Sequence, residues 1–180
     1  MRRITTRQVT FAGMFAALAA LLSIYPFTFY LPDFSRITFR EIPIYLCSFT
    51  LGPVWGGLCA FVSDLLGTFI SNSGNSWNPM FAISAVLSGV IPGILFRYAF
   101  KKEKLTLAIT LSIVPVNIAV SLFLTTLWFQ MLGYTGGMPF WAYLLIRRLW
   151  LVTVMTVIQI LIVRALYPVV RKGIQGGDPS

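Results

Sequence analysis

The stretch from Leu105 to Met131, LTLAITLSIVPVNIAVSLFLTTLWFQM, carries no charged side chain and decides the class of fold. A helix needs about 20 predominantly apolar residues to cross the hydrocarbon core of a bilayer, and this stretch is longer. The sequence therefore predicts a membrane-spanning helix here, and similar segments on both sides of it predict several more.

The composition of the whole chain agrees with a membrane protein. Of its 180 residues, 57% are hydrophobic and 11% charged, and the mean hydropathy is +0.82. Soluble domains carry about 25% charged residues, so this chain is too apolar to be covered by water. Its net charge of +9 would suit nucleic acid, but the basic residues flank apolar runs instead of forming one face. We therefore expect a protein of the lipid bilayer that does not bind nucleic acid.

Six apolar segments predict an all-α, polytopic membrane domain over residues 1–172. The first segment follows basic residues, as in a signal peptide, but it is long enough to span and further spans follow, so we interpret it as a retained helix. The polar tail, residues 173–180, is expected to be disordered. The segments are expected at about residues 9–27, 37–52, 53–70, 79–98, 105–131 and 139–167, with Pro168 stopping the last.

The topology depends on the second segment, which is short for a span and could be re-entrant when taken alone. Lys and Arg are enriched in cytoplasmic loops, and three basic clusters fall on one side only if this segment crosses. We therefore predict six spans in the cell membrane with both termini in the cytoplasm. The clusters are Arg2, Arg3 and Arg7; Arg97, Lys101, Lys102 and Lys104; and Arg164, Arg171 and Lys172.

Four further arginines border or enter apolar segments at the opposite, outward face: Arg36, Arg40, Arg147 and Arg148. Arg147 lies about 12 Å into the sixth segment, where a charge costs at least about 2.5 kcal/mol unless it is paired or wet. Adjacent helix residues point about 100° apart, so one of Arg147 and Arg148 can face a cavity while the other snorkels outward. Guanidinium groups bind carboxylate or phosphate through two hydrogen bonds, which favours an anionic ligand. The alternative is that these arginines only anchor helices at the interface.

Asp64 is the one acid well inside an apolar segment, about 16 Å into the third. A buried carboxylate would protonate or pair, so Asp64 is the natural counter-charge for Arg147 or Arg148. A structural ion pair and direct contact with a ligand are both open interpretations.

Aromatic and amide side chains frame the same face. Interfacial Trp and Tyr residues usually form a belt at the membrane surface, but such rings could also stack on a flat heterocycle. Asn117 follows Pro115, whose missing N–H frees a carbonyl one turn back, and a kink with a nearby amide can line a cavity. The candidate substrate-binding residues of this group are Trp77, Asn78, Phe81, Asn117, Trp128 and Tyr134.

Ala12, Ala16 and Ala20 form a stripe of small residues in the first segment. At this spacing, small residues let a second helix approach closely within a membrane. The stripe predicts either packing inside the domain or a docking face for a partner.

Nothing in the sequence indicates an enzyme, a cofactor or a metal site. The chain contains no histidine, the commonest metal ligand and general base. Cys47 and Cys59 lie in apolar segments outside any spaced metal or redox motif and are expected to be packing residues. No GxxxxGK[ST] phosphate loop is present, so a transport function would need ATP hydrolysis by another subunit.

Over residues 7–170 the chain resembles the substrate-binding S component of energy-coupling factor (ECF) vitamin transporters, and within that family the folate-specific type. The size, the six spans and the alanine stripe carry part of this resemblance. The motifs that carry the rest are RITFREIP at 36–43, LGPVWGG at 51–57, DLLG at 64–67, NPMF at 78–81, IPG at 91–93 and TTLW at 125–128.

The resemblance implies a vitamin-binding subunit of an ABC importer. Such a subunit captures its vitamin from outside, docks on a transmembrane scaffold driven by two cytoplasmic ATPases, and tips over in the membrane to release the vitamin inside. The alanine stripe would be the docking face, and the outer loops at 28–38, 71–78 and 132–138 would gate the site.

The resemblance also implies roles for single residues. Arg36, Arg40 and one of Arg147 and Arg148 would meet the glutamate carboxylates of folate. The ring would lie against Trp77, Phe81 or Trp128. Three alternatives are an S component for another small heterocyclic vitamin, a membrane assembly subunit that binds no ligand, and a small standalone channel or carrier.

Overall fold

The computed structural model describes residues 5–24, 29–30, 36–70, 78–99, 104–133 and 135–175, and the description below is confined to them. They fold into helices, apart from one antiparallel pair of two-residue strands, so the expected all-α class is confirmed. In chain order the elements are α1 (Thr6–Leu22), β1 (Phe29–Tyr30), β2 (Arg36–Ile37), α2 (Glu41–Leu51), α3 (Pro53–Ile70), α4 (Pro79–Ile94), η1 (Leu95–Ala99), α5 (Leu105–Val116), η2 (Asn117–Leu124), α6 (Thr125–Met131), α7 (Phe140–Ala142), η3 (Tyr143–Arg148) and α8 (Leu149–Gln175).

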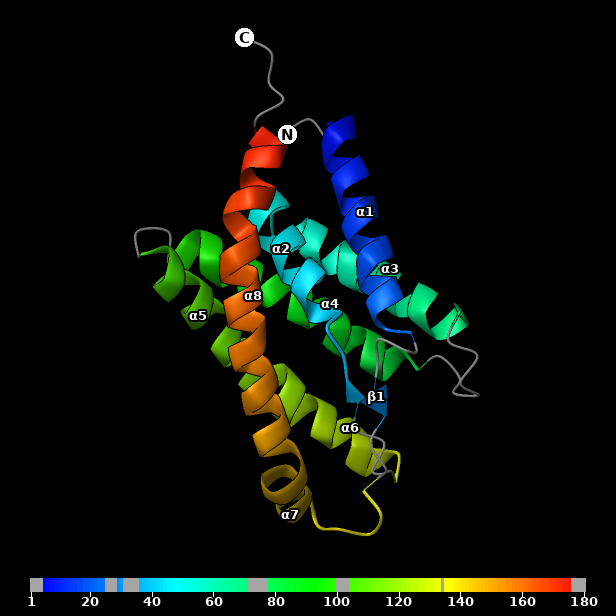
Figure 1. Ribbon diagram of the computed structural model, residues 1–180. Helices are drawn as coiled ribbons and strands as arrows, with labels where there is room; N and C mark the ends of the chain where they lie inside the picture. Colours follow the sequence, from blue (N-terminus) through cyan, green and yellow to red (C-terminus); the bar gives the residue numbers. More distant parts are fainter. Residues whose placement is uncertain are drawn as a thin grey trace.

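Several of these elements join end to end, so that the described chain forms six helical segments (Figure 1). α4 continues into η1, α5 continues through η2 into α6, and α7 continues through η3 into α8. Four segments are long and apolar enough to cross a membrane: 53–70, 79–99, 105–131 and 140–174. α1 and α2 are shorter apolar helices, as the sequence indicated for the second segment.

The last helix does not stop at Pro168, which corrects the predicted boundary. α8 runs on to Gln175 with Pro168 inside it, and so enters the segment expected to be a polar tail. Proline removes one backbone donor, but the turns on either side keep theirs. Val170 and Ile174, beyond the proline, pack against the hydrophobic core and hold the last turns in place.

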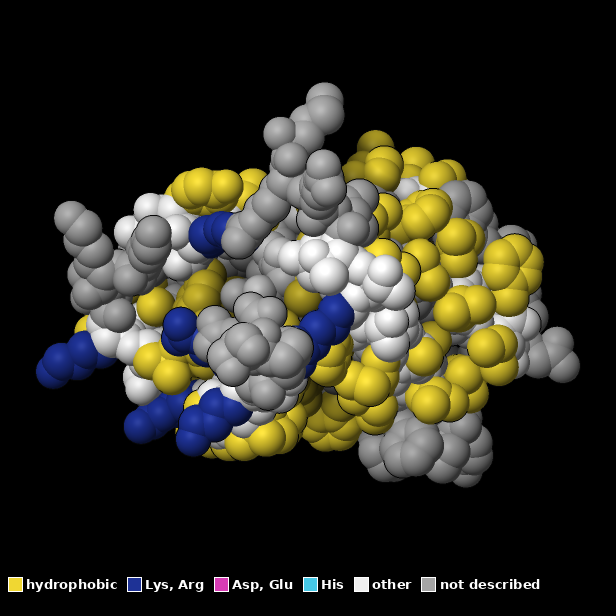
Figure 2. Space-filling model, turned by 90° about the horizontal axis from the view of Figure 1, so that it is seen from above, with side chains coloured by type: hydrophobic (Ala, Val, Ile, Leu, Met, Phe, Trp, Pro, Cys, Tyr) yellow, Lys and Arg dark blue, Asp and Glu magenta, His cyan; other side chains and the backbone are white. Residues whose placement is uncertain are grey.

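The start of α1 and the end of α8 lie at one end of the molecule, where Lys and Arg side chains gather (Figures 1 and 2). Arg7 Nη2 donates to the carbonyl of Gly173 over 2.8 Å, which ties the first helix to the last. Arg97 Nη1 approaches Gly52, in the turn between α2 and α3. The α2–α3 turn therefore lies beside η1, and the predicted topology places both of them on the side of the termini. That this end faces the cytoplasm remains a prediction from the positive-inside rule.

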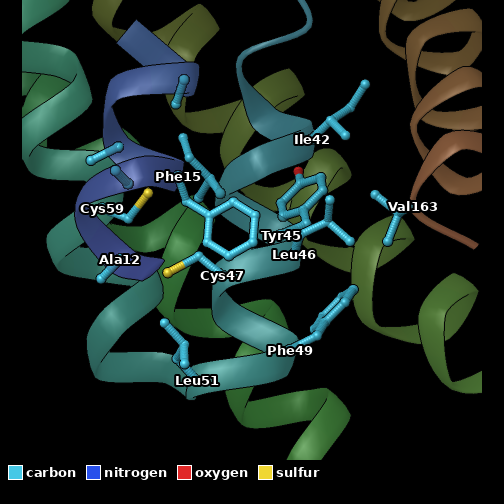
Figure 3. Close-up of a cluster of buried hydrophobic side chains, with 14 of the residues drawn as sticks. Ala12, Phe15, Ile42, Tyr45, Leu46, Cys47, Phe49, Leu51, Cys59 and Val163 are labelled. Carbon is cyan, nitrogen blue, oxygen red and sulfur yellow. The ribbon is translucent and has the colours of Figure 1, made fainter. Parts of the chain in front are cut away.

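The hydrophobic core is centred on α2, and residues of α1, α3, α4, α5 and α8 surround it (Figure 3). Tyr45, Cys47 and Cys59 are almost fully buried there, in keeping with the packing role expected of both cysteines. The ring of Phe49 stacks on Phe96 at 4.4 Å between centroids, and Phe96 meets Tyr167 edge-on at 5.5 Å. These three rings join α2, η1 and α8 at the end that holds the termini.

α3 and α4 cross in backbone contact, because glycines face each other at the crossing. A Cβ on Gly89 would overlap the carbonyl oxygen of Gly56, so neither position has room for a side chain. Ser48 of α2 fills the adjoining space and donates to the carbonyl of Gly89 over 2.6 Å. Small residues allow such close approach in membrane helices, and here they lock α2, α3 and α4 into one unit.

Candidate functional site

The least exposed charged side chains of the described chain are Arg40, just before α2, and Asp64 in α3, and they form an ion pair. Arg40 Nη1 lies 2.8 Å from Asp64 Oδ1, and both side chains are buried. Asp64 is therefore a structural ion-pair residue as predicted, but its partner is Arg40, and the predicted pairing with Arg147 or Arg148 is wrong. The reason is tertiary. The start of α2 lies beside α3, whereas η3 contacts η2 and, through Arg148 and Tyr143, the Phe129 ring of α6.

Arg40 is consequently not an exposed interfacial charge available for a ligand carboxylate. Its guanidinium faces a second acid, because Nε lies 3.7 Å from Oε1 of Glu41. Glu41 in turn accepts a hydrogen bond from Ser88 Oγ of α4 over 3.1 Å. One cation and two carboxylates thus meet at the junction of α2, α3 and α4.

The structure separates the two arginines that the sequence could not distinguish. Arg148 is 8% exposed, whereas Arg147, one position earlier in the π-helical segment η3, is exposed. Arg148 Nη2 donates to the carbonyl of Ser121 over 2.9 Å, and its guanidinium lies 5.0 Å from the centre of the Phe129 ring. A cation over an aromatic face is attracted by the ring quadrupole, which helps to hold this charge inside.

Three residues of α4 organise the site, and we call Phe81, Ser84 and Ser88 the α4 ladder. They lie at i, i+3 and i+7, on one face of the helix, and span about 10 Å of its length. Phe81 meets the Phe129 ring edge-on, at 5.6 Å between centroids. Ser84 Oγ accepts from Trp128 Nε1 over 2.9 Å.

Through its partners the ladder connects two charged regions of opposite character. At the Phe81 end, Phe129 carries the buried guanidinium of Arg148 on its ring. At the Ser88 end, Glu41 belongs to the cluster with Arg40 and Asp64. The aromatic residues of α6 lie between the two regions. This sequence of cation, rings and carboxylate can bind an elongated molecule with an anionic end, an aromatic middle and a hydrogen-bond-donating end.

The two predicted asparagines have their side chains engaged within the protein. Asn78 caps α4, since its Oδ1 accepts from the N–H of Met80 over 3.0 Å. Asn117 is buried at the start of η2, accepts from Tyr45 Oη over 2.8 Å, and donates to Thr156 and Gln159 of α8 over 2.9 and 2.8 Å. The Asn117 amide therefore fastens three helices together, which is a positioning role.

Three predicted binding residues fall outside the part of the chain that is described. Trp77 and Tyr134 are not described, and of Arg36 only the backbone is. Arg36 pairs with Tyr30 in the short β1–β2 ladder. The ligand contacts expected of these three side chains stay predictions.

The alanine stripe of α1 packs inside the chain, which corrects its expected role as an exposed docking face. Ala12, Ala16 and Ala20 are between 3% and 8% exposed, because α1 lies against α2 and α3. The opposite face of α1 is open, with Gly13 and Ala17 as its small residues. The spacing of small residues correctly indicated close packing of α1. Whether the Ala12, Ala16 and Ala20 face or the Gly13 and Ala17 face points outward depends on the neighbouring helices.

Sequence reasoning missed Glu41, Ser84, Ser88 and Phe129 as members of this site. A weak signal existed for the serines, since residues four apart lie on one helix face. Glu41 entered the sequence analysis only as part of the RITFREIP motif at 36–43. No pattern in the sequence connects it to Ser88, because that contact joins residues 47 positions apart.

Fold and site together define a multi-pass helical membrane protein with a buried cation, aromatic rings and a carboxylate along one helix face. The chain belongs to the family of ECF transporter substrate-specific components, whose model matches residues 7–171. Members of this family are transporter components and not enzymes.

Two solved structures and one curated protein are similar to the chain. The crystal structure of FolT bound with folic acid matches with a TM-score of 0.74 and 25% identity, covering 91% of this chain and 94% of FolT. A structure of the S component of a bacterial ECF transporter matches with a TM-score of 0.57 at 20% identity, covering 94% and 95%, and supports the fold alone. The folate transporter FolT of Clostridium novyi (strain NT) is 31% identical over 97 residues, 54% of each chain, so this match spans about half of that relative.

Proposed function

We propose that this protein is the folate-binding subunit of an ECF-type importer. Folate is elongated: it carries carboxylates at one end, a benzoyl ring in the middle and a pterin ring at the other end. The observation that carries the proposal is the order of groups along the α4 ladder, from Arg148 through Phe81, Phe129 and Trp128 to Glu41. The likeness to FolT in its folic-acid-bound form supports the same substrate.

Arg148 is the residue proposed to meet the glutamate carboxylates of the substrate. Its guanidinium is buried, and a buried charge interacts more strongly with a ligand charge than an exposed one does. The guanidinium fork also suits a carboxylate geometrically. Phe81 and Trp128 are proposed to lie against the ring system, together with Trp77 and Tyr134 from the outer loops, and Arg36 is proposed to contribute at the entrance.

The proposed transport cycle uses the subunit as a carrier without an ATPase site of its own. It captures folate from outside, docks on a transmembrane scaffold bound to two ATPases, and tips in the membrane so that the site opens inward. The exposed face of α1 supports docking there: Gly13 has open space around it, and Ala17 lies one turn further on. Small residues on a lipid-facing surface allow a partner helix to approach closely.

Binding is tested by purifying the chain in detergent and titrating it with folic acid, followed by tryptophan fluorescence and calorimetry. We expect saturable binding of folic acid, and much weaker binding of vitamins that lack a carboxylate. Mass spectrometry of the protein from cells grown with folate should detect the bound vitamin. Tight binding of another heterocyclic vitamin, or of none in a broad panel, would contradict the proposal and favour one of the alternatives.

Docking is tested separately by placing a bulky side chain on each face of α1. Ala17→Trp should stop folate uptake in cells that express the scaffold and the ATPases, while the purified variant still binds folic acid. Ala16→Trp is the contrast, because Ala16 is 4% exposed and its replacement should disturb folding as well. Normal uptake by Ala17→Trp would exclude this face of α1 as the docking surface.

A further inference from the structure

Arg147 is an exposed cation at the head of an apolar helix face. α8 runs from the end of the molecule where α1 starts to the opposite end (Figure 1), and its segment is the least buried of the four that are long enough to span a membrane. Four apolar side chains follow Arg147 on the same face, at i+3, i+7, i+10 and i+14, and each is at least half exposed. We call this set the α8 stripe: Trp150, Val154, Val157 and Leu161. Within a membrane, an exposed apolar face of this kind meets lipid.

A second exposed arginine marks the other end of the α8 stripe. Arg164 lies about 25 Å further along the helix axis than Arg147, at 1.5 Å per residue, and residues 149–163 between them carry no charge. The hydrocarbon core of a bilayer is about 30 Å thick, and arginine side chains extend towards the nearer headgroups. The two arginines therefore lie at opposite edges of the core, and Arg147 lies at the edge away from the start of α1.

The level of Arg147 in the membrane decides which chemical group it meets. The phosphates of phospholipids lie at the edge of the core, and a guanidinium binds phosphate through two parallel hydrogen bonds. Tryptophan rings favour the same level, and the exposed rings of Trp141 and Trp150 precede and follow Arg147. A cation above an apolar stripe matches the order of groups in one phospholipid, from the phosphate to the acyl chain.

We propose that Arg147 binds the phosphate of a phospholipid and that an acyl chain of the same lipid lies along the α8 stripe. The site is separate from the proposed folate site, because Arg148 turns inward whereas Arg147 faces outward. It goes beyond the proposed function, since it needs neither folate nor a scaffold. Its role is to fix the depth of α8 in the bilayer by holding the helix to the headgroups at one edge.

A second copy of the chain fits the same face less well. Two copies that met through the α8 stripe would bring two Arg147 side chains to one contact, and like charges repel. The acids among the described residues are Glu41 and Asp64, and both belong to the cluster with Arg40, away from this face. Within the described part of the chain, no acid is therefore placed to pair with Arg147 across such a contact, whereas every phospholipid brings its own anion.

The test uses two photoactivatable lipids with the same diazirine-bearing acyl chains, a phosphatidylglycerol and a diacylglycerol that lacks the phosphate. The full chain is delipidated in a maltoside detergent and a buffer free of phosphate, mixed with either lipid and illuminated, and the labelled residues are mapped by peptide mass spectrometry. We expect the phosphatidylglycerol to label the α8 stripe about fivefold more than the diacylglycerol, the upper range for an ion pair at an exposed site. Arg147→Gln should remove this preference while labelling next to Arg164 stays unchanged, which provides the internal control.

Arg147→Lys is the second variant, because it keeps the charge and lysine also binds phosphate. It should retain most of the preference for phosphatidylglycerol, and thermal unfolding in detergent should show that both variants fold like the wild type. Equal labelling of the stripe by the two lipids, or an unchanged preference in Arg147→Gln, would overturn the proposal. So would a loss of labelling on addition of soluble glycerol phosphate, which would indicate a site for a free anion. Absence of any lipid label on the wild-type stripe would show that another protein surface covers it.

Discussion

The two halves of α4 make contacts of opposite kinds. The C-terminal half meets α2 and α3 at backbone distance through Gly89 and Gly56, with Ser48 bonded to the Gly89 carbonyl. The N-terminal half meets α6 through large side chains, the Phe81 ring and the Trp128 indole. Backbone contacts leave no room for change, whereas rings can separate and close again on a ligand. We infer that the C-terminal half of α4 is a rigid base and that the N-terminal half is the adaptable side of the site.

The largest effect on stability is expected from breaking the ion pair between Arg40 and Asp64, which lies next to the rigid base. Asp64→Asn leaves the Arg40 guanidinium buried beside one remaining acid, and breaking a buried pair costs about 3–5 kcal/mol. The loss would be measured as reduced thermal stability and reduced monodisperse yield in detergent. The double variant Arg40→Met, Asp64→Leu should recover much of it, because replacing both partners by apolar groups leaves no buried charge. No recovery would show that the pair has a role beyond stability.

The next effect is expected at the glycine crossing itself. Gly89→Ala places a methyl group where the Gly56 carbonyl lies, and overpacking of this kind costs about 1–3 kcal/mol. Thermal unfolding in detergent would report it. Gly13→Ala is the matched control, since nothing lies near that position, and it should be neutral or slightly stabilising. Equal effects at both positions would mean that α3 and α4 are free to move apart.

On the adaptable side, substitutions should reduce binding more than stability. Arg148→Gln is expected to weaken folic acid binding by about tenfold to hundredfold, the usual worth of hydrogen bonds to a charged group. Arg147→Gln is its matched control, because that side chain points outward, and it should change the affinity by less than about twofold. Isothermal titration of the two variants makes the comparison. A larger loss in Arg147→Gln would reverse the assignment of the inward-facing arginine.

The smallest effect is expected from replacing Trp128, whose indole is hydrogen-bonded to Ser84 in the middle of the α4 ladder. Trp128→Phe keeps a ring but removes the hydrogen bond to Ser84, and should weaken folic acid binding by about threefold to tenfold. Trp150→Phe, at an exposed position in α8, is the control and should leave the affinity unchanged. Fluorescence titration would suffice for both. An effect on thermal stability as large as that of Gly89→Ala would contradict the contrast between the two halves of α4.

Much of the fold could be predicted because its causes are local. The segment Leu105–Met131 forms one continuous helix with the predicted bounds, since an apolar run of that length needs no partner to specify it. The predicted end of the last helix at Pro168 was wrong, because the loss of one backbone N–H donor does not end a helix whose later turns pack on the core. The alanine stripe was recognised, but a helix has two sides, and the sequence of α1 alone does not say which one α3 covers.

The sequence by itself determined that this protein lies in a membrane, that it is helical, and that some cations must lie inside it. Those properties follow from composition and periodicity along the chain. Only the tertiary structure decided that Asp64 pairs with Arg40, that Arg148 turns inward, and that Glu41 meets Ser88. Such pairings depend on distances between helices, and charge–charge and hydrogen-bond energies fall off too steeply with distance for spacing along the chain to predict them.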